Sequence, residues 1–437
     1  MPVELLLTLA TAPISTRPIR RRRRPAGPSG AGLLRLGWLL PLMLLLMGLL
    51  GGTTTTARAQ TAPPTCSEDE KFANTWYFGS KAGLDFNQAT DSIKPVVLTD
   101  GAMTAPAGAG VMSDGSGKIL FYSNGDTIWN GNGTIMTNGT GMGGNRLTTD
   151  GPLPIRLPGS PPPTMPGGET RYLIFTQDAK GGPKGLSYSE IIIPAGGGAG
   201  TVVAATKNTP LTQGTTEKMT GVFHKNGCDI WIIVHGWGNA TTGTANRGDA
   251  FLAYRVRLVA GGVGPVLIDP PVISAVGSLH APSVSPEGYR GQMKVTPDGQ
   301  QLALSRYSAV AGDSSSSVEL FSFDTSTGMV GSPRIIDSKE GGYYGVEFSP
   351  GRSRLYATVL GAAPRLPQLL QFDISGPGTG MAAKAVIPLK QTTPVNLGSM
   401  QAAPDGKIYV AREGSRRWAL SPTPIRWGPP LPTPTTA

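Results

Sequence analysis

The sequence predicts an all-β fold, a β-propeller of WD-like blades, from three observations. Glycine and proline are abundant, at 61 and 40 of 437 residues, which marks many turns. A strand–turn–strand pattern recurs, with turn prolines at Pro297, Pro350 and Pro404 that lie 53 and 54 residues apart. No segment shows the apolar spacing of a long amphipathic helix. Units of about 50 residues, each with four short strands, are typical of propeller blades.

Three late segments carry the repeat most clearly. Each is a short strand, a tight turn and an apolar strand, and they are Gln292–Ser305, Val346–Thr358 and Met400–Ala411. In each turn proline fixes φ at the first corner, and glycine supplies a positive φ further on. Alternating third strands that end in aspartate and a turn follow at Val318–Gly328 and Gln368–Gly376.

Earlier segments fit the pattern more loosely. They are Val111–Asn130, Gly167–Asp178 and Phe223–Trp237, with an inserted loop at Asn239–Gly248. A small twisted sheet with two apolar faces can bury both only between neighbours, so we expect the units to form a ring. A pair of β-sandwiches is the alternative, but it gives no reason for the even spacing.

The N-terminal residues are typical of an export signal. Five arginines, Arg20 to Arg24, precede an apolar run, Leu36–Leu50, that is short for a membrane span. Small residues follow the apolar run, so we expect a signal peptidase to cleave between Ala59 and Gln60. The alternative is that the segment is not cleaved and remains as a membrane anchor. The predicted division is a signal peptide at 1–59, a leader at 60–71, a propeller at 72–413 and a tail at 414–437.

The formal net charge of +10 is not distributed evenly along the chain. Residues 1–59 hold eight arginines against one glutamate, and Arg416, Arg417 and Arg426 lie in the tail. The predicted propeller is therefore close to neutral and has no basic stripe. We expect no nucleic-acid partner, because phosphate binding needs clustered cations.

Cys66 and Cys228 are the only cysteines in the chain. Export permits a disulfide, and Cys66 lies in an extended leader that can reach Cys228. Two unrelated thiols are an equal alternative. No zinc-ligand spacing occurs, and we expect neither a metal nor another cofactor.

Several segments taken together resemble one family, the N-terminal β-propeller of Bacteroidetes-type secreted surface proteins. Such proteins often carry PKD-type repeats and a gliding-motility-associated C-terminal sorting domain. The resemblance implies export, a seven-bladed ring and a surface or adhesive role, and it supplies no reaction. The segments that carry it are Asn74–Phe86, Val96–Met103, Ile119–Asn130, Ile135–Asn145, Leu186–Ile191, Thr216–Trp237 and Ala403–Glu413.

The chain departs from this family after Glu413. Gly414–Ala437 is rich in proline, arginine and threonine and is typical of disorder. A shifted reading frame of Trp418–Ala437 can encode a strand like the family's continuation, so we interpret the end as truncated or frameshifted. We then expect the last blades to be incomplete, with the strands around Trp76–Phe86 in the last blade awaiting a partner. Without a sorting domain the periplasm becomes a possible destination.

Candidate binding residues gather around one predicted hairpin. His224 and His235 flank its turn and are expected to lie near enough to share a ligand. Polar residues that hold turns and blade interfaces together are the simpler alternative. The full candidate set for a carbohydrate or metal near the mouth of the ring is Glu217, Lys218, His224, His235, Trp237 and His280.

The sequence thus favours an exported binding, adhesion or interaction module without its own catalysis. Its ligand is expected to be a carbohydrate or a protein, at the cell surface, outside the cell or in the periplasm, with no membrane span after cleavage. The alternative is an exported, lactonase-like propeller hydrolase, which needs a metal or a His/acid site at the central channel.

Overall fold

The computed structural model describes residues 3–7, 71–90, 92–161, 168–362, 365–376, 382–388 and 395–413. These residues all fall in one of the two units of the chain, Met1–Ala12 with Thr65–Ala437. The predicted cleavage site at Ala59 and Gln60, the apolar run Leu36–Leu50 and the tail from 414 lie outside the described residues. No helix in the described part of the chain is long and apolar enough to span a membrane.

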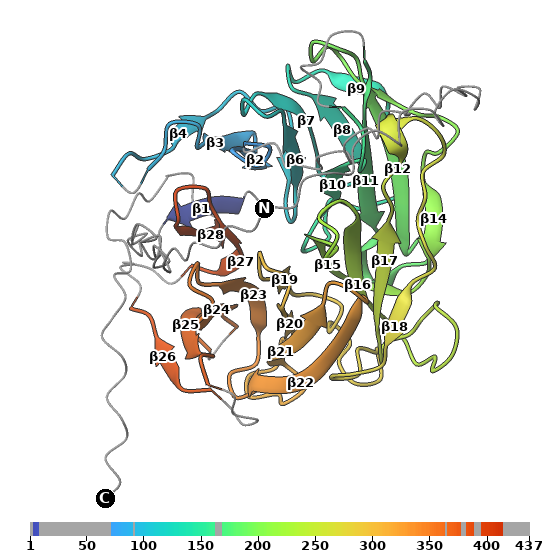
Figure 1. Cartoon of the computed structure of the whole chain (residues 1–437). Coiled ribbons are helices and arrows are strands. Elements are labelled where there is room, and N and C mark those ends of the chain that lie inside the picture. Colours follow the sequence, from blue (N-terminus) through green and yellow to red (C-terminus); the bar gives the residue numbers. More distant parts are fainter. Residues whose placement is uncertain are drawn as a thin grey trace, which may run out of the picture. The chain divides into compact units, whose positions relative to one another are not determined.

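Sheets dominate this unit, and the sheets are arranged as in a β-propeller (Figure 1). The predicted fold class is therefore confirmed, while the count of seven blades stays a prediction. Among the described residues the helical elements are two short 3₁₀ turns, η1 (Ala179–Gly181) and η2 (Ala260–Gly262).

The first sheet has the strand order β4-β3-β2-β5. Its strands are β2 (Thr75–Ser80), β3 (Ala82–Asp85), β4 (Val96–Leu98) and β5 (Thr104–Ala105). The expectation that Trp76–Phe86 belongs to the last blade of the ring stays a prediction, and in the structure β2 pairs with β3 and β5. A short turn at Lys81, where φ is 61°, connects β2 to β3.

The next sheet consists of two consecutive meanders joined edge to edge. A single parallel pair, Thr201 with Thr137, connects them. The first meander has β6 (Gly110–Ser113), β7 (Ile119–Ser123), β8 (Thr127–Asn130) and β9 (Ile135–Thr140). The second has β10 (Leu153–Arg156), β11 (Thr170–Gln177), β12 (Leu186–Ile193), β13 (Thr201–Val202) and β14 (Thr209–Thr212).

Three antiparallel four-stranded meanders follow, and they contain the clearest sequence repeats. The first has β15 (Thr215–Phe223), β16 (Ile230–Gly236), β17 (Phe251–Val256) and β18 (Val272–Ser274). The second has β19 (Met293–Val295), β20 (Gln301–Arg306), β21 (Ser317–Asp324) and β22 (Met329–Asp337). The third has β23 (Tyr343–Phe348), β24 (Arg354–Val359), β25 (Gln368–Asp373) and β26 (Lys384–Val386).

The last sheet has three strands in the order β1-β28-β27. They are β27 (Leu397–Ala402), β28 (Ile408–Glu413) and β1 (Val3–Leu7), and β1 pairs antiparallel with β28. This sheet meets the first one through aromatic rings, since Tyr409 packs edge-on against Trp76 and Phe86 at 5.5 and 5.2 Å. First and last sheets are thus neighbours.

The first strand of each meander lies on the inner side of the arrangement (Figure 1). Contacts run from β2 to β6, β10, β15, β19, β23 and β27 in turn. Apolar clusters fill the space between adjacent sheets, as in the set that joins Trp231 and Phe251 to Leu302 and Phe321. Burial of these faces between neighbours is the main favourable term for such a fold.

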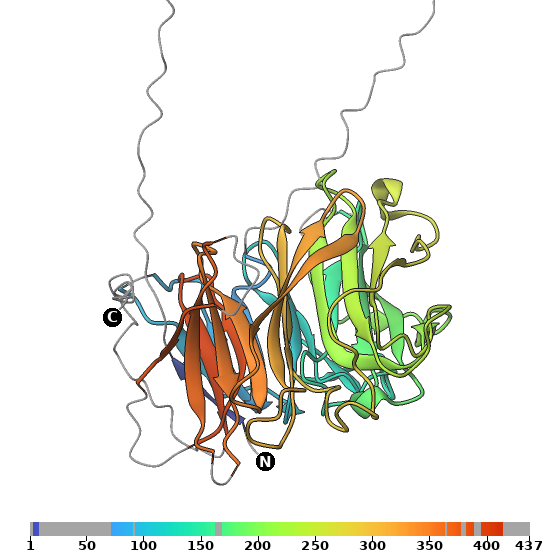
Figure 2. The same cartoon turned by 90° about the horizontal axis from the view of Figure 1, so that it is seen from below.

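Strands of the sheets run between two faces made of loops and turns (Figure 2). At one of these two faces the inner strands begin, and the second strand of each meander connects to the third strand. We call this face the start face. Its residues include Asp150, Glu217 and Tyr344. The other, where first strands turn into second strands, is the end face, and it includes the turns at His224–Asp229 and Asp298.

Candidate functional site

A cluster of arginine and tyrosine side chains lies at the start face. Arg290 belongs to the connection before β19, and its guanidinium lies over the rings of Tyr289 and Tyr307 at 5.8 and 5.6 Å. Tyr344, at the beginning of β23, meets Tyr307 edge-on at 6.4 Å. Tyr289 and Tyr307 are buried, whereas the Arg290 side chain is 36% exposed. The partly exposed Arg290 side chain therefore packs over two buried aromatic rings.

Lys218 on β15 is hydrogen-bonded to the backbone of this cluster. Its side chain is fully buried, and its Nζ donates to the carbonyl oxygens of Gly288, Tyr289 and Arg290 at 3.2, 3.3 and 2.5 Å. Burial lowers the pKa of Lys218 to about 7, while nearby Asp150 favours the charged form. Because the three N–H groups of an ammonium match three carbonyls, Lys218 fixes the backbone that presents Arg290.

Two carboxyl groups lie at the same level of the ring. Oδ2 of Asp150 accepts from the backbone N–H groups of Met219 and Met293, both at 3.0 Å, and so connects the beginnings of three meanders. Burial raises the pKa of Asp150 to about 7. Glu217 accepts from Thr149 and from the backbone of Lys180, and burial raises its pKa as well.

His235 and His280 form a buried pair rather than a surface site. Their rings lie 4.0 Å apart, and the side chains are 0% and 1% exposed. Each Nδ1 meets a carbonyl oxygen, His235 at Gly236 and His280 at Ser278, so each ring carries its proton there. The Nε2 atoms have no hydrogen-bond partner among the described residues. Burial lowers the pKa of His235 to about 3 and that of His280 well below its usual value.

The structure brings together five of the six predicted site residues and separates the sixth. Trp237 packs edge-on against Tyr289 at 5.6 Å, next to Glu217 and Lys218 at the start face. His224 lies in the turn before β16, whereas His235 lies near the end of that seven-residue strand. A strand of this length spans roughly 20 Å. The expectation that these two histidines share a ligand is therefore wrong.

Groups that converge from other meanders were not among the predicted site residues. Asp150, Tyr289, Arg290, Tyr307 and Tyr344 stand in or beside connections at the start face, far apart along the chain. The repeat itself was the available indication, because the residues just before each inner strand must gather around one axis.

Cys228 is disulfide-bonded. It lies in the end-face turn, and Cys66, the only other cysteine of the sequence, is outside the described residues. In the described part of the chain no three His, Cys, Asp or Glu side chains are grouped to hold a metal ion.

No protein-family model and no curated protein matches the chain. Solved structures similar to it share little sequence. The periplasmic gluconolactonase of Pseudomonas aeruginosa is 12% identical with a TM-score of 0.28, over 54% of this chain and 73% of that one. A GH43 β-1,3-galactosidase is 11% identical with a TM-score of 0.33, over 67% and 59%. A protein of unknown function from Desulfotomaculum acetoxidans is 12% identical with a TM-score of 0.33, over 72% and 83%.

Proposed function

We propose that this protein is an exported, non-catalytic binding module that holds a neutral saccharide at the start face of its propeller. One observation carries the proposal: the partly exposed Arg290 side chain lies over two tyrosine rings, and the buried Lys218 holds the Arg290 backbone. Export rests on the basic, then apolar, N-terminal segment, and a surface role rests on the family resemblance.

The chemistry of the cluster favours sugar hydroxyl groups as ligands. Guanidinium, carboxyl and phenol groups lie together there, and such planar polar groups with aromatic neighbours suit the mixed polar and apolar faces of a sugar. Charges are balanced, because Glu287 lies 3.5 Å from Arg290, and Asp150 and Glu217 lie near the same loop. A neutral saccharide therefore fits better than a strongly charged polymer.

Binding of the purified full-length protein to an array of neutral oligosaccharides tests the proposal. We expect a subset to bind, and we expect Arg290→Ala to weaken the best of them at least tenfold in calorimetry. Arg257→Ala is the matched control, because Arg257 is 55% exposed and pairs with Asp269 at 3.7 Å, away from the cluster. No binding to any neutral saccharide, or equal affinity of wild type and Arg290→Ala, would contradict the proposal.

A propeller hydrolase is the second candidate, favoured by the pKa of about 7 at Asp150. A carboxyl group with such a pKa can donate or accept a proton at neutral pH. Turnover of lactones or aryl glycosides by wild type, lost in Asp150→Asn, would support this candidate. Turnover that is unchanged in Asp150→Asn would remove it.

A further inference from the structure

One loop of the start face presents Arg290, and a buried ammonium group holds the backbone of this loop. We call Ser285–Gly291, just before β19, the Arg290 loop. Nζ of Lys218 donates to the carbonyl oxygens of Gly288, Tyr289 and Arg290. Among the described residues, no other donor reaches the carbonyl oxygens of Gly288 and Arg290. The position of the Arg290 loop therefore depends on the three N–H groups of a charged Lys218.

Loss of one proton from Lys218 changes this arrangement. A neutral amine has two N–H groups and a lone pair, so it cannot donate to three carbonyl oxygens, and its lone pair faces one of them. The Lys218 side chain is fully buried, so water does not supply the missing donor. A buried acceptor without a donor is costly, and the Arg290 loop relieves this cost by moving toward solvent.

Charged and titratable groups act on Lys218 from several of the elements around it. The carboxylates among them favour its ammonium form, and the guanidinium of Arg306 opposes that form. His235 and His280 stay neutral near pH 7, because burial lowers their pKa values. Since burial lowers the pKa of Lys218 to about 7, its charge changes close to neutral pH. The groups that act on Lys218 are Asp150, Glu217, His235, His280, Arg306 and Glu319.

Asp150 connects Lys218 to the Arg290 loop by a second route. Its Oδ2 accepts from the backbone of Met219, next to Lys218, and from that of Met293, two residues after the loop. Burial raises the pKa of Asp150 to about 7, so it titrates in the same pH range as Lys218. The two groups therefore titrate as a coupled pair, and the negative charge of Asp150 keeps the proton on Lys218 to higher pH.

We propose that Lys218 and Asp150 form a pH-sensitive latch, which holds the Arg290 loop while Lys218 is charged and releases the loop in mild alkali. As a regulator of saccharide binding, the latch rests on the function proposed above, because a released Arg290 no longer lies over Tyr289 and Tyr307. The loop movement itself needs no saccharide. It can therefore be measured in the protein without a ligand.

Hydrogen exchange of the full-length protein without a ligand tests the latch. The backbone N–H groups of Gly288 and Arg290 donate to the carbonyl oxygens of Ser285 and Glu287, both at 3.0 Å, so their exchange reports on the Arg290 loop. We expect their protection to fall at least tenfold from pH 6.5 to 8.5, after correction for the faster base-catalysed exchange of any amide at higher pH. Constant protection over this range would overturn the proposal.

Two substitutions locate the effect in the buried pair. Asp150→Asn keeps an oxygen atom for Met219 and Met293 but removes the negative charge, so the loss of protection should move to lower pH by about one unit or more. Lys218→Met should leave the Arg290 loop unprotected already at pH 6.5. If Lys218→Met fails to fold, Asp150→Asn alone decides, and an unshifted transition in that variant would overturn the role of the pair.

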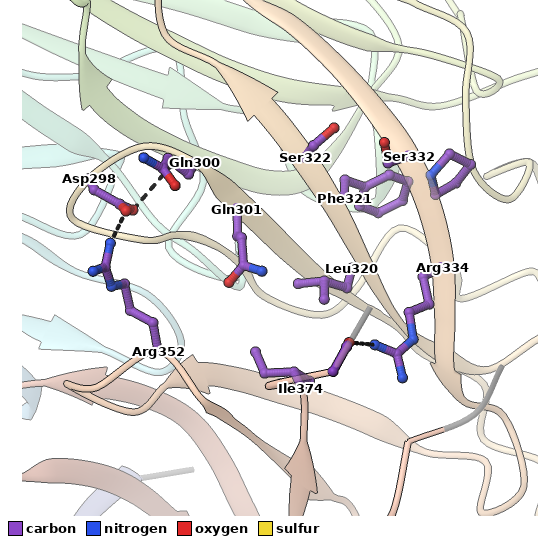
Figure 3. Close-up of a pocket in the computed structure, with 12 residues that line it drawn as sticks. Asp298, Gln300, Gln301, Leu320, Phe321, Ser322, Ser332, Arg334, Arg352 and Ile374 are labelled. Atoms are coloured by element: carbon purple, nitrogen blue, oxygen red, sulfur yellow. Dashed lines mark hydrogen bonds and ion pairs between the residues drawn. The ribbon is translucent and has the colours of Figure 1, made fainter. Parts of the chain in front are cut away.

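Asp298→Asn is the matched control for the loss of a carboxylate. Asp298 lines a pocket at the end face, in the turn between β19 and β20, where it pairs with Arg352 (Figure 3). The Arg290 loop lies at the opposite face, so Asp298→Asn should lose protection at the same pH as wild type. A shift in Asp298→Asn equal to that in Asp150→Asn would contradict a specific pairing of Asp150 with Lys218.

The array of neutral oligosaccharides, measured at pH 6.5 and 8.5, separates the latch from the proposed function. Binding that weakens at least tenfold at pH 8.5, together with the loss of protection, supports both. Equal binding at the two pH values while protection falls would overturn the latch as a regulator. Loss of protection without binding at either pH supports the latch and contradicts only the proposed saccharide.

Discussion

The buried pair His235 and His280 should make the fold sensitive to mild acid. Both rings are neutral, with the proton on Nδ1, and protonation would place a cation among Lys218 and Arg306 in a closed space. In the unfolded chain a histidine has a pKa of about 6.5, whereas that of folded His235 is about 3. The unfolded state therefore binds more protons between these values, and stability falls as the pH drops below about 6.5.

The size of the effect follows from proton linkage. His235 contributes a slope of up to about 1.4 kcal/mol per pH unit, which amounts to about 2 kcal/mol between pH 6.5 and 4.5, and His280 acts in the same direction. Asp150 acts in the opposite direction, because its raised pKa makes the folded state bind more protons between about pH 4 and 7. That contribution is present in both wild type and histidine variants, so it cancels in their difference.

The assay is urea unfolding of wild type and His235→Gln at pH 7.5, 6.0, 5.0 and 4.5. The variant loses ring packing against Phe251, whose centroid lies 4.6 Å away, so its stability at pH 7.5 should be lower. Its slope with pH should be smaller by about 1.4 kcal/mol per unit below pH 6, since one proton is no longer taken up on unfolding. A stability difference that stays constant from pH 7.5 to 4.5 would refute this reasoning.

Two further predictions concern packing at the ring. Lys218→Met should lower the free energy of unfolding by about 3 kcal/mol in urea titrations, because the carbonyls of Gly288–Arg290 lose their donor; an unchanged midpoint would contradict the role given to Lys218. Gly328→Ala should cost more than Gly312→Ala, although both glycines have positive φ, because only at Gly328 would the Cβ lie within 2.6 Å of the Trp231 ring. Equal losses of melting temperature in the two variants would contradict this packing.

The sequence was sufficient for the fold class because the repeat is local. Turn prolines Pro297, Pro350 and Pro404 mark the hairpins β19–β20, β23–β24 and β27–β28 as they occur in the structure. The alternation of apolar residues within each strand and the fixed spacing between turns can both be recognised from neighbouring residues in the sequence. Burial of Lys218 and the histidine pair, by contrast, depends on which meanders become neighbours.

The candidate site was only partly predictable for the same reason. Asp150 bonds to Met219 and Met293, which lie 69 and 143 residues away in sequence, so only the closed order of the sheets brings them together. His224 and His235 are close in sequence but separated by the length of β16. The register shift between β21 and β22 has no local signature in the sequence beyond Ser332 and Pro333.

A crystal structure of the full-length protein with its best-binding neutral oligosaccharide tests the central claim most directly. We predict saccharide density at the start face, in hydrogen-bonding distance of the Arg290 guanidinium and beside Tyr344. Density on the outer strands or at the end face alone, with the Arg290 cluster unchanged, would contradict the account.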